Sequence, residues 1–134
     1  MSNYVLDSSA VLCFLRNEAG AEQMDSLFAD VANEHVIHAV NWVEVRYLEK
    51  RGRLPAETSF QAFVERLGIK VSTDLRPELL DEVARLKAEY PPIALGDCFA
   101  VALAQTLRSA LISTSRTELE KVASAGECEI IFLR

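Results

Sequence analysis

Residues 4–12, YVLDSSAVL, decide the fold of this chain. Three apolar residues end at Asp7, and two serines that can cap a helix separate this aspartate from a second apolar run. The first run predicts a short buried strand, and the second predicts a largely buried helix over residues 10–15. Asp7 is therefore expected to lie where the first strand ends and the first helix begins.

The rest of the chain continues this alternation of short apolar strands with amphipathic helices. Strands and helices that alternate in this way indicate one α/β domain over residues 1–134, with a mostly parallel sheet of about five strands flanked by helices. Further strands are predicted over residues 35–40, 69–71, 110–112 and 129–133. Helices are predicted over residues 21–33, 41–51, 55–67, 77–90, 96–103 and 118–123.

Length, charge and cysteine content limit the class of protein. The 134 residues suit one domain, and the net charge of −6 argues against a passive nucleic-acid binder, although the acids of a nuclease site would add to that charge. Three cysteines among apolar neighbours indicate buried thiols in a reducing compartment. The N-terminus carries no export signal and no apolar run is long enough to span a membrane, so we expect a cytoplasmic protein without a membrane partner.

Three acidic residues, Asp7, Glu44 and Asp97, stand in apolar surroundings near predicted strand or helix ends. In an open parallel sheet, ligands bind at the carboxyl ends of the strands, so these carboxylates can meet at one edge. Crowded carboxylates raise one another's pKa, and a hard divalent cation relieves their repulsion. Such a cation also activates water and clamps a phosphodiester. The pattern therefore indicates a Mg²⁺ or Mn²⁺ site for cutting phosphodiesters.

A local explanation competes for each acid. Glu44 follows Asn41 at the spacing of a capping box, in which its carboxylate would reach the Asn41 backbone amide. Asp97 follows Gly96 as an N-cap would, and Asp7 can cap the helix after it. Capping explains each acid slightly better when that acid is taken alone, whereas three such acids in one small domain favour a shared site.

Three segments resemble the acidic motifs of PIN-domain ribonucleases. They are residues 4–12, residues 41–45 (NWVEV) and residues 95–104 (LGDCFAVALA), and Ile-Ser-Thr follows at 112–114. More narrowly, the order, spacing and length resemble the VapC toxins of bacterial VapBC toxin–antitoxin pairs. The similarity covers essentially the whole chain.

This resemblance implies a single PIN-like nuclease domain, residues 1–134, that forms a homodimer and is silenced by a cognate antitoxin. It implies a Mg²⁺- or Mn²⁺-dependent endoribonuclease, the toxin of a type II toxin–antitoxin pair, that cleaves cellular RNA by metal-activated water. Asp7, Glu44 and Asp97 would then be both the catalytic and the metal-binding residues.

One position departs from the family pattern. Family members often have a further Asp two residues after the Thr that matches Thr114, and this chain has Arg116 there. Either Ser115, Glu118 or Glu120 takes its place, or three acids hold a single metal. The number of metal ions therefore stays open.

Four side chains near these motifs are candidate RNA contacts. Arg46 belongs to a basic run at the end of the helix that carries Glu44, where it can steer RNA or simply complement the helix dipole. Arg116 can face an RNA phosphate or solvent. The candidate substrate-binding residues are Thr114, Ser115, Arg116 and Arg46.

Three other classes of protein are alternatives. A catalytically degenerate PIN-like protein that binds RNA or acts as a scaffold is favoured by Arg116 and by the acidic balance. A phosphotransferase that uses Asp7 as a covalent nucleophile is disfavoured, because Ser9 stands where haloacid-dehalogenase-type phosphatases have a second Asp. A receiver-like signalling domain would need a Lys after a late strand, and this chain has none there.

Overall fold

Five strands and seven helices follow one another in the computed structural model, which describes residues 3–134. The strands are β1 (Asn3–Leu6), β2 (Glu34–His38), β3 (Lys70–Ser72), β4 (Ala110–Ser113) and β5 (Ile130–Phe132). The helices are α1 (Ser8–Leu15), α2 (Ala21–Ala29), α3 (Ala39–Lys50), α4 (Phe60–Leu67), α5 (Pro77–Glu89), α6 (Leu95–Leu107) and α7 (Arg116–Ser124).

All five strands are parallel and lie in the order β3-β2-β1-β4-β5, which confirms the predicted α/β sheet. The chain builds outward from β1 on one side and then crosses to β4 on the other, so the strand order reverses between β1 and β4. Leu6, the last residue of β1, pairs with Ile37 in β2 and with Ile112 in β4. Asp7 and Ser113 follow at the same edge of the sheet. This edge is the switch point where open α/β sheets bind ligands.

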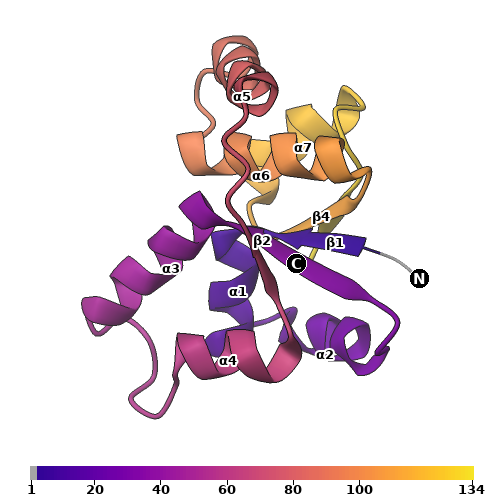
Figure 1. The fold of residues 1–134 in the computed structure, drawn as a ribbon. Helices are drawn as coiled ribbons and strands as arrows, with labels where there is room; N and C mark the ends of the chain where they lie inside the picture. The colour runs from indigo at the N-terminus through magenta and orange to yellow at the C-terminus, as the bar shows by residue number, and fades with distance from the viewer. Residues whose placement is uncertain (1–2) are drawn as a thin grey trace.

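Helices cover both faces of the sheet, as the sequence predicts (Figure 1). Successive strand residues point to opposite faces, so Val5 and Leu111 join one apolar cluster and Leu6 and Ile112 join the other. The first cluster includes side chains of α5, α6 and α7, and the second includes those of α1, α2 and α4. Helix α6 contacts both β1 and α5, which agrees with its apolar sequence.

Several predicted helix boundaries differ from the structure, and local hydrogen bonds explain two of the differences. The helix expected over residues 21–33 ends at Ala29, because Asp30 is extended and its side chain accepts a hydrogen bond from the Ala32 amide. Val31, expected on the apolar side of that helix, is 97% exposed. The helix expected to begin at residue 55 begins at Phe60, where the Ser59 hydroxyl caps it.

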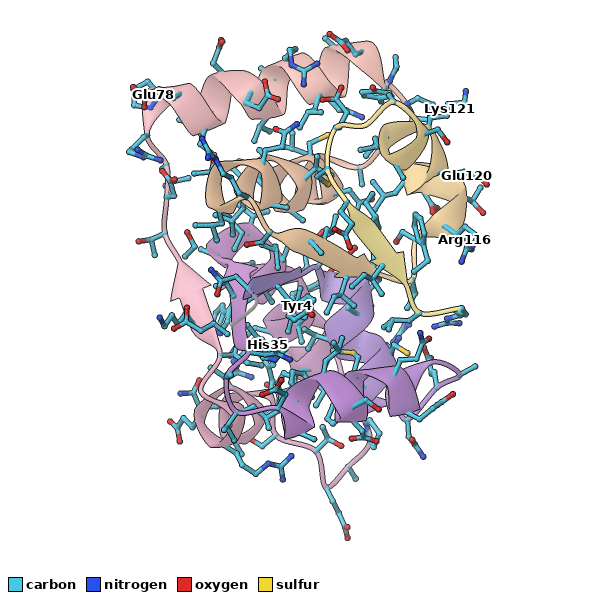
Figure 2. All side chains as sticks on the ribbon, turned by 90° about the vertical axis from the view of Figure 1, so that its right-hand side faces the viewer. Tyr4, His35, Glu78, Arg116, Glu120 and Lys121 are labelled. Atoms are coloured by element: carbon cyan, nitrogen blue, oxygen red, sulfur yellow. The ribbon has the colours of Figure 1, made fainter. Side chains whose placement is uncertain are left out.

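The two histidines of β2 are buried, and both make structural contacts. His38 ends the strand two residues earlier than predicted, because its Nδ1 accepts a hydrogen bond from the Val40 amide and so starts α3. Its Nε2 donates to the carbonyl oxygen of Asp74 (2.9 Å). The His35 ring lies beside that of Tyr4, at 5.6 Å between centroids (Figure 2), and it also contacts the ring of Phe28, at 4.6 Å.

Two further observations bear on the class of protein. None of the helices within residues 3–134 is long and apolar enough to cross a membrane. The three cysteines are free, with Cys13 and Cys98 buried and Cys128 partly exposed.

Candidate active site

Asp7 is fully buried at the carboxyl end of β1. Its Oδ1 accepts hydrogen bonds from the Ser9 hydroxyl (2.6 Å) and from the Ala10 amide (2.9 Å), so Asp7 caps α1 as predicted. The cap uses only one carboxylate oxygen: Oδ2 is buried and has no hydrogen-bond partner within residues 3–134. Burial is the main cause that raises the pKa of Asp7, and the negative charge of Glu44 raises it further.

Asp97 lies in the first turn of α6 rather than at its N-cap. Ala94 is the cap residue, so the capping role predicted for Asp97 is wrong. Burial raises the pKa of Asp97 to about 7, and the charges of Asp7, Glu44 and Glu118 add to this shift. Asp7, Glu44 and Glu118, from three other segments of the chain, are therefore near enough to Asp97 for their charges to act on it.

The predicted capping box between Asn41 and Glu44 does not form. His38 caps α3, and Asn41 stands inside the helix with its side chain fully buried. The Asn41 Nδ2 donates one hydrogen bond of 2.8 Å to Glu44 Oε1 and another of 3.1 Å to the Gly96 carbonyl oxygen. The Glu44 carboxylate is thus held by a side chain of its own helix, beside the first turn of α6.

Gly96 allows this close approach of α3 to α6. A Cβ atom at position 96 would lie 2.5 Å from Glu44 Oε2 and 2.7 Å from Oε1, well inside van der Waals contact. Gly96 is itself buried and directly precedes Asp97. The missing side chain therefore brings the Glu44 carboxylate against the backbone that carries Asp97.

The donor chemistry fits Mg²⁺ or Mn²⁺, because hard divalent cations prefer oxygen ligands. Asp7 offers a buried oxygen without a partner in the described chain, and no basic group contributes to the pKa shift of Asp97. Among residues 3–134, however, no three His, Cys, Asp or Glu side chains are grouped as one metal-binding set. The carboxylates therefore have the chemistry that such an ion requires, but within the described residues they are not arranged as a preformed metal-binding site.

Sequence reasoning missed Ser113 and took Ser9 for a cap. Ser9 lies inside α1, accepts a hydrogen bond from the Thr114 amide (3.0 Å) and stands 3.2 Å from Ser113 Oγ. Ser113 is fully buried at the end of β4 and accepts a hydrogen bond from the Ser115 amide (2.9 Å). Thr114 and Ser115 therefore lie at the same sheet edge as Asp7. The signal for Ser113 is a lone polar residue that ends an apolar strand.

The two arginines predicted as RNA contacts have other partners. The Arg116 guanidinium carbon lies 4.6 Å from the centroid of the Phe132 ring, and its Nε donates to the backbone oxygen of Arg134 (3.0 Å). Arg46 forms an ion pair of 2.8 Å with Glu49 on the same helix. Both arginine side chains are therefore engaged with groups other than the carboxylates of Asp7, Glu44 and Asp97.

Glu118 and Glu120, both considered for the missing fourth acid, differ in position. The charge of Glu118 raises the pKa of Asp97, so Glu118 lies near the site. Glu120 is exposed and projects from the outer side of α7, as Lys121 does (Figure 2). Glu118 is therefore the better candidate.

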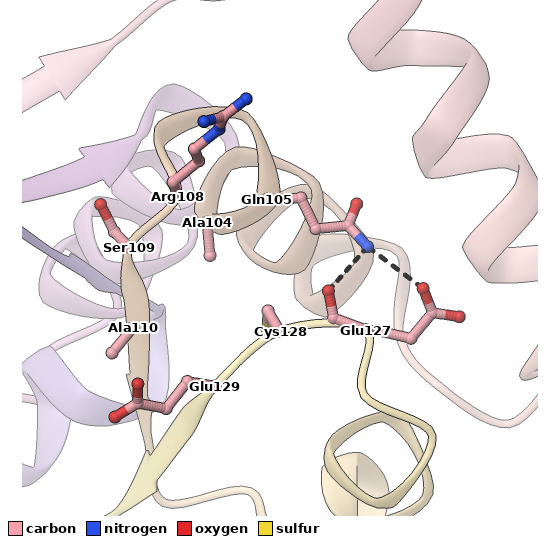
Figure 3. A pocket seen from close by; sticks show the side chains of 8 residues that line it. All are labelled: Ala104, Gln105, Arg108, Ser109, Ala110, Glu127, Cys128 and Glu129. Carbon is pink, nitrogen blue, oxygen red and sulfur yellow. Dashed lines mark hydrogen bonds between the residues drawn. The ribbon is translucent and has the colours of Figure 1, made fainter.

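A cavity of about 330 Å³ lies at the opposite edge of the sheet, where α6 passes into β4 (Figure 3). Gln105 reaches across it and donates to the backbone oxygen (3.0 Å) and to Oε1 (3.1 Å) of Glu127. Glu127 also accepts hydrogen bonds from Arg85 and Tyr90. Its charge is therefore already paired, and the cavity is separate from the acidic site.

An α/β domain with acidic residues at the switch point of its parallel sheet is the class that the fold and the site define. The family model of the PIN domain matches residues 4–125. The chain therefore belongs to the PIN domain family, which confirms the expectation from its motifs. No match is found among curated proteins.

Solved structures share this fold over nearly the whole chain. A chain of a toxin–antitoxin complex from Klebsiella pneumoniae is 17% identical, with a TM-score of 0.69 and 98% of each chain covered. VapBC2 from Rickettsia felis, bound to a DNA fragment from its promoter, gives 13% identity and a TM-score of 0.69, covering 97% of this chain and 98% of that one. DNA-bound VapBC from Salmonella typhimurium gives 15% identity and a TM-score of 0.67, with 100% of each chain covered. At these identities the likeness shows the fold.

Proposed function

We propose that this protein is a Mg²⁺- or Mn²⁺-dependent endoribonuclease and the toxin component of a type II toxin–antitoxin pair. The observation that carries the proposal is the buried Oδ2 of Asp7, which has no hydrogen-bond partner within residues 3–134, and the charges of Glu44 and Asp7 that reach Asp97 agree with it. A fully buried acid beside two half-buried ones, as Asp7 is beside Glu44 and Asp97, is costly unless a cation compensates their charge. Membership of the PIN domain family and a fold shared with toxin–antitoxin complexes support this proposal.

Asp7, Glu44 and Asp97 would hold the ion, with Oδ2 of Asp7, which has no hydrogen-bond partner within residues 3–134, as one ligand oxygen. When bound, the ion supplies a water nucleophile of lowered pKa and neutralises charge on the scissile phosphate. Glu44 is our choice for orienting the attacking water, because Asn41 holds its Oε1 while its Oε2 accepts no hydrogen bond from the described residues. Ser9 and Ala10 keep Asp7 from rotating by binding its other oxygen.

The partners follow from the same proposal. The substrate is a cellular RNA, which would approach over Thr114 and Ser115 at the edge of the site. Arg46 and Arg116 would contact RNA only after leaving Glu49 and Phe132, respectively. A cognate antitoxin and a second copy of this chain, in the cytoplasm, complete the assembly that we propose.

The test compares the wild-type protein with Asp7→Asn and Asp97→Asn. Induction of the wild-type protein alone should halt growth, and the purified protein should cleave RNA with Mg²⁺ or Mn²⁺ and stop when EDTA is added. Both variants should fold, lose cleavage and permit growth. Undiminished cleavage by purified Asp7→Asn protein would refute the assignment. A short upstream reading frame for a DNA-binding antitoxin would support the toxin role independently.

The second candidate is a catalytically degenerate PIN-like protein that binds RNA or serves as a scaffold. It is favoured by Arg116 at the position where a further Asp is common, and by the absence of a grouped metal-binding set within residues 3–134. Calorimetry with Mn²⁺ separates the two. A nuclease should bind the ion through Asp7 and Asp97, whereas a scaffold should give no heat that the two variants abolish.

A further inference from the structure

We infer that Asn41 and Gly96 act together as positioning residues for Glu44 in the proposed metal-dependent reaction. The inference rests on the proposed function and adds two residues to it. Neither Asn41 nor Gly96 carries a charge, and neither is among the acids that would bind the ion. Both act through the carboxylate of Glu44.

The hydrogen bonds of Asn41 join the two segments that carry Glu44 and Asp97. One proton of its Nδ2 goes to Glu44 Oε1 at 2.8 Å, and the other goes to the Gly96 carbonyl oxygen at 3.1 Å. Both partners are oxygen acceptors, so the orientation of the amide is fixed: its oxygen could not take either place without repulsion. The amide therefore sets the separation between Glu44 and the backbone before Asp97.

Gly96 fixes the same carboxylate from the other side. An added Cβ would meet both Glu44 oxygens and its Cδ, at 2.5, 2.7 and 2.8 Å. These atoms are the far end of a flexible side chain, so a larger residue at position 96 would displace the carboxylate rather than the helices. The Glu44 carboxylate thus rests between the amide of Asn41 and the bare Cα of Gly96.

A role in stability alone explains Asn41 poorly. The cap of α3 is already provided by His38, so Asn41 is not needed to begin the helix. Its Oδ1 is buried without a hydrogen-bond partner in the described residues, which is unfavourable for folding. An apolar residue of similar shape would avoid that cost, but it could not hold Glu44. The positioning role accounts for the amide at this place.

The experiment measures Mn²⁺ binding, without RNA, to the wild-type protein and to Asn41→Leu and Gly96→Ala. Both variants should fold, since Asn41→Leu gives up two hydrogen bonds but also removes an unpaired polar atom, and Gly96→Ala displaces only a side-chain tip. Each should bind Mn²⁺ about 10- to 100-fold more weakly, the loss typical of a residue that supports a metal ligand. Crystal structures of the metal-free variants should show the Glu44 carboxylate moved from its wild-type place.

Asn33→Leu is the matched control. Asn33 also donates its Nδ2 to a backbone carbonyl, that of Leu27, at 3.0 Å, but it lies on the loop after α2. This variant should bind Mn²⁺ like the wild-type protein. Equal loss of affinity in Asn33→Leu and Asn41→Leu would overturn the inference.

The outcomes also separate this inference from the proposed function. If the wild-type protein binds no Mn²⁺, the proposed function fails, and the metal-free structures alone decide the positioning role. If Asn41→Leu and Gly96→Ala leave Glu44 in place, or bind Mn²⁺ as tightly as a competent wild-type protein, the inference is wrong. If Glu44 moves in both, the positioning role stands.

Discussion

The hydroxyl oxygens of Ser9 and Ser113 lie 3.2 Å apart, although 104 residues separate them in the sequence. Ser9 donates its hydroxyl proton to Asp7 and accepts a hydrogen bond from the Thr114 amide. Ser113 has its own incoming hydrogen bond from the Ser115 amide. A chain of hydrogen bonds thus runs from the end of β4 to the Asp7 carboxylate at the end of β1.

Replacing Ser9 with Ala should raise the pKa of Asp7. The Ser9 hydrogen bond favours the ionised carboxylate and lowers its pKa, and its removal leaves the raising effect of burial less opposed. The loss of the bonds to Asp7 and Thr114 should also cost about 1 kcal/mol of stability. Carbon-13 NMR titration of the Asp7 carboxyl group in the metal-free protein measures the shift. Ser109→Ala, which removes an exposed hydroxyl at the far end of α6, is the control and should leave Asp7 unchanged. An equal Asp7 titration in both variants would contradict the prediction.

Asp97 should make the metal-free fold less stable as the pH rises. Its folded pKa of about 7 lies above the ordinary value of 3.8, so the folded state holds the proton more tightly than the unfolded state does. The stability that Asp97 contributes is therefore full below about pH 4 and is lost as the pH rises through about 7. Asp97→Asn should remove this slope, so its melting temperature should exceed that of the wild-type protein at pH 8 and approach it at pH 5.

Mg²⁺ provides the control for this pH dependence. The ion competes with the proton on Asp97, so it should stabilise the wild-type protein more at pH 8 than at pH 5 and have little effect on Asp97→Asn. Thermal melts at both pH values, with and without Mg²⁺, measure the four differences. A wild-type protein whose melting temperature relative to Asp97→Asn is the same at pH 5 and pH 8 would refute the raised pKa.

Arg85 should stabilise the fold without serving the acidic site. It binds Glu127 (2.7 Å), whose side chain is only 14% exposed, as well as Glu82 and Glu89. Arg85→Met would leave the Glu127 charge without a cation and should cost about 1–3 kcal/mol in urea unfolding. The hydrogen bonds of Arg85 hold the pKa of Glu127 below its ordinary value of 4.5, so the difference should shrink as the pH falls below that value.

The control for Arg85 is Lys70→Met. The Lys70–Glu34 pair is also an ion pair at 3.0 Å, but both side chains are well exposed, so its loss should cost less than about 1 kcal/mol. Mn²⁺ binding should be unchanged in both variants. Equal losses of stability, or a weakened metal site in Arg85→Met, would mean that the network around Glu127 has a different role.

The sequence predicts the fold well because the hydrophobic pattern within each short segment is enough to identify its strands and helices. Apolar runs of strand length, ended by Asp7 and by Ser113, need no knowledge of distant residues. Local patterns also explain the errors. The Asn41-to-Glu44 spacing is that of a capping box, and nothing within four residues reveals that the Asn41 side chain instead joins the Glu44 carboxylate to the Gly96 carbonyl oxygen.

Contacts between distant segments set the rest of the site. Gly96 reads as an ordinary helix start, and its importance depends on the approach of Glu44 from a helix 52 residues earlier in sequence. His38 reads as a strand residue, yet it caps α3 and moves the start of that helix. The assignment of Asp7, Glu44 and Asp97 to catalysis stays a prediction that the variants above test.

Glu118→Gln and Glu120→Gln together test which acid of α7 acts on the site. The charge of Glu118 raises the pKa of Asp97, so Glu118→Gln should lower it, but only modestly because Glu118 is exposed and water screens its charge. Glu120 projects from the outer side of α7 (Figure 2), and its charge is not among those that raise the pKa of Asp97, so the matched variant should leave Asp97 unchanged. NMR titration of the Asp97 carboxyl group in the metal-free protein gives both values. A larger shift in Glu120→Gln than in Glu118→Gln would exclude Glu118 as the replacement for the acid that Arg116 displaces.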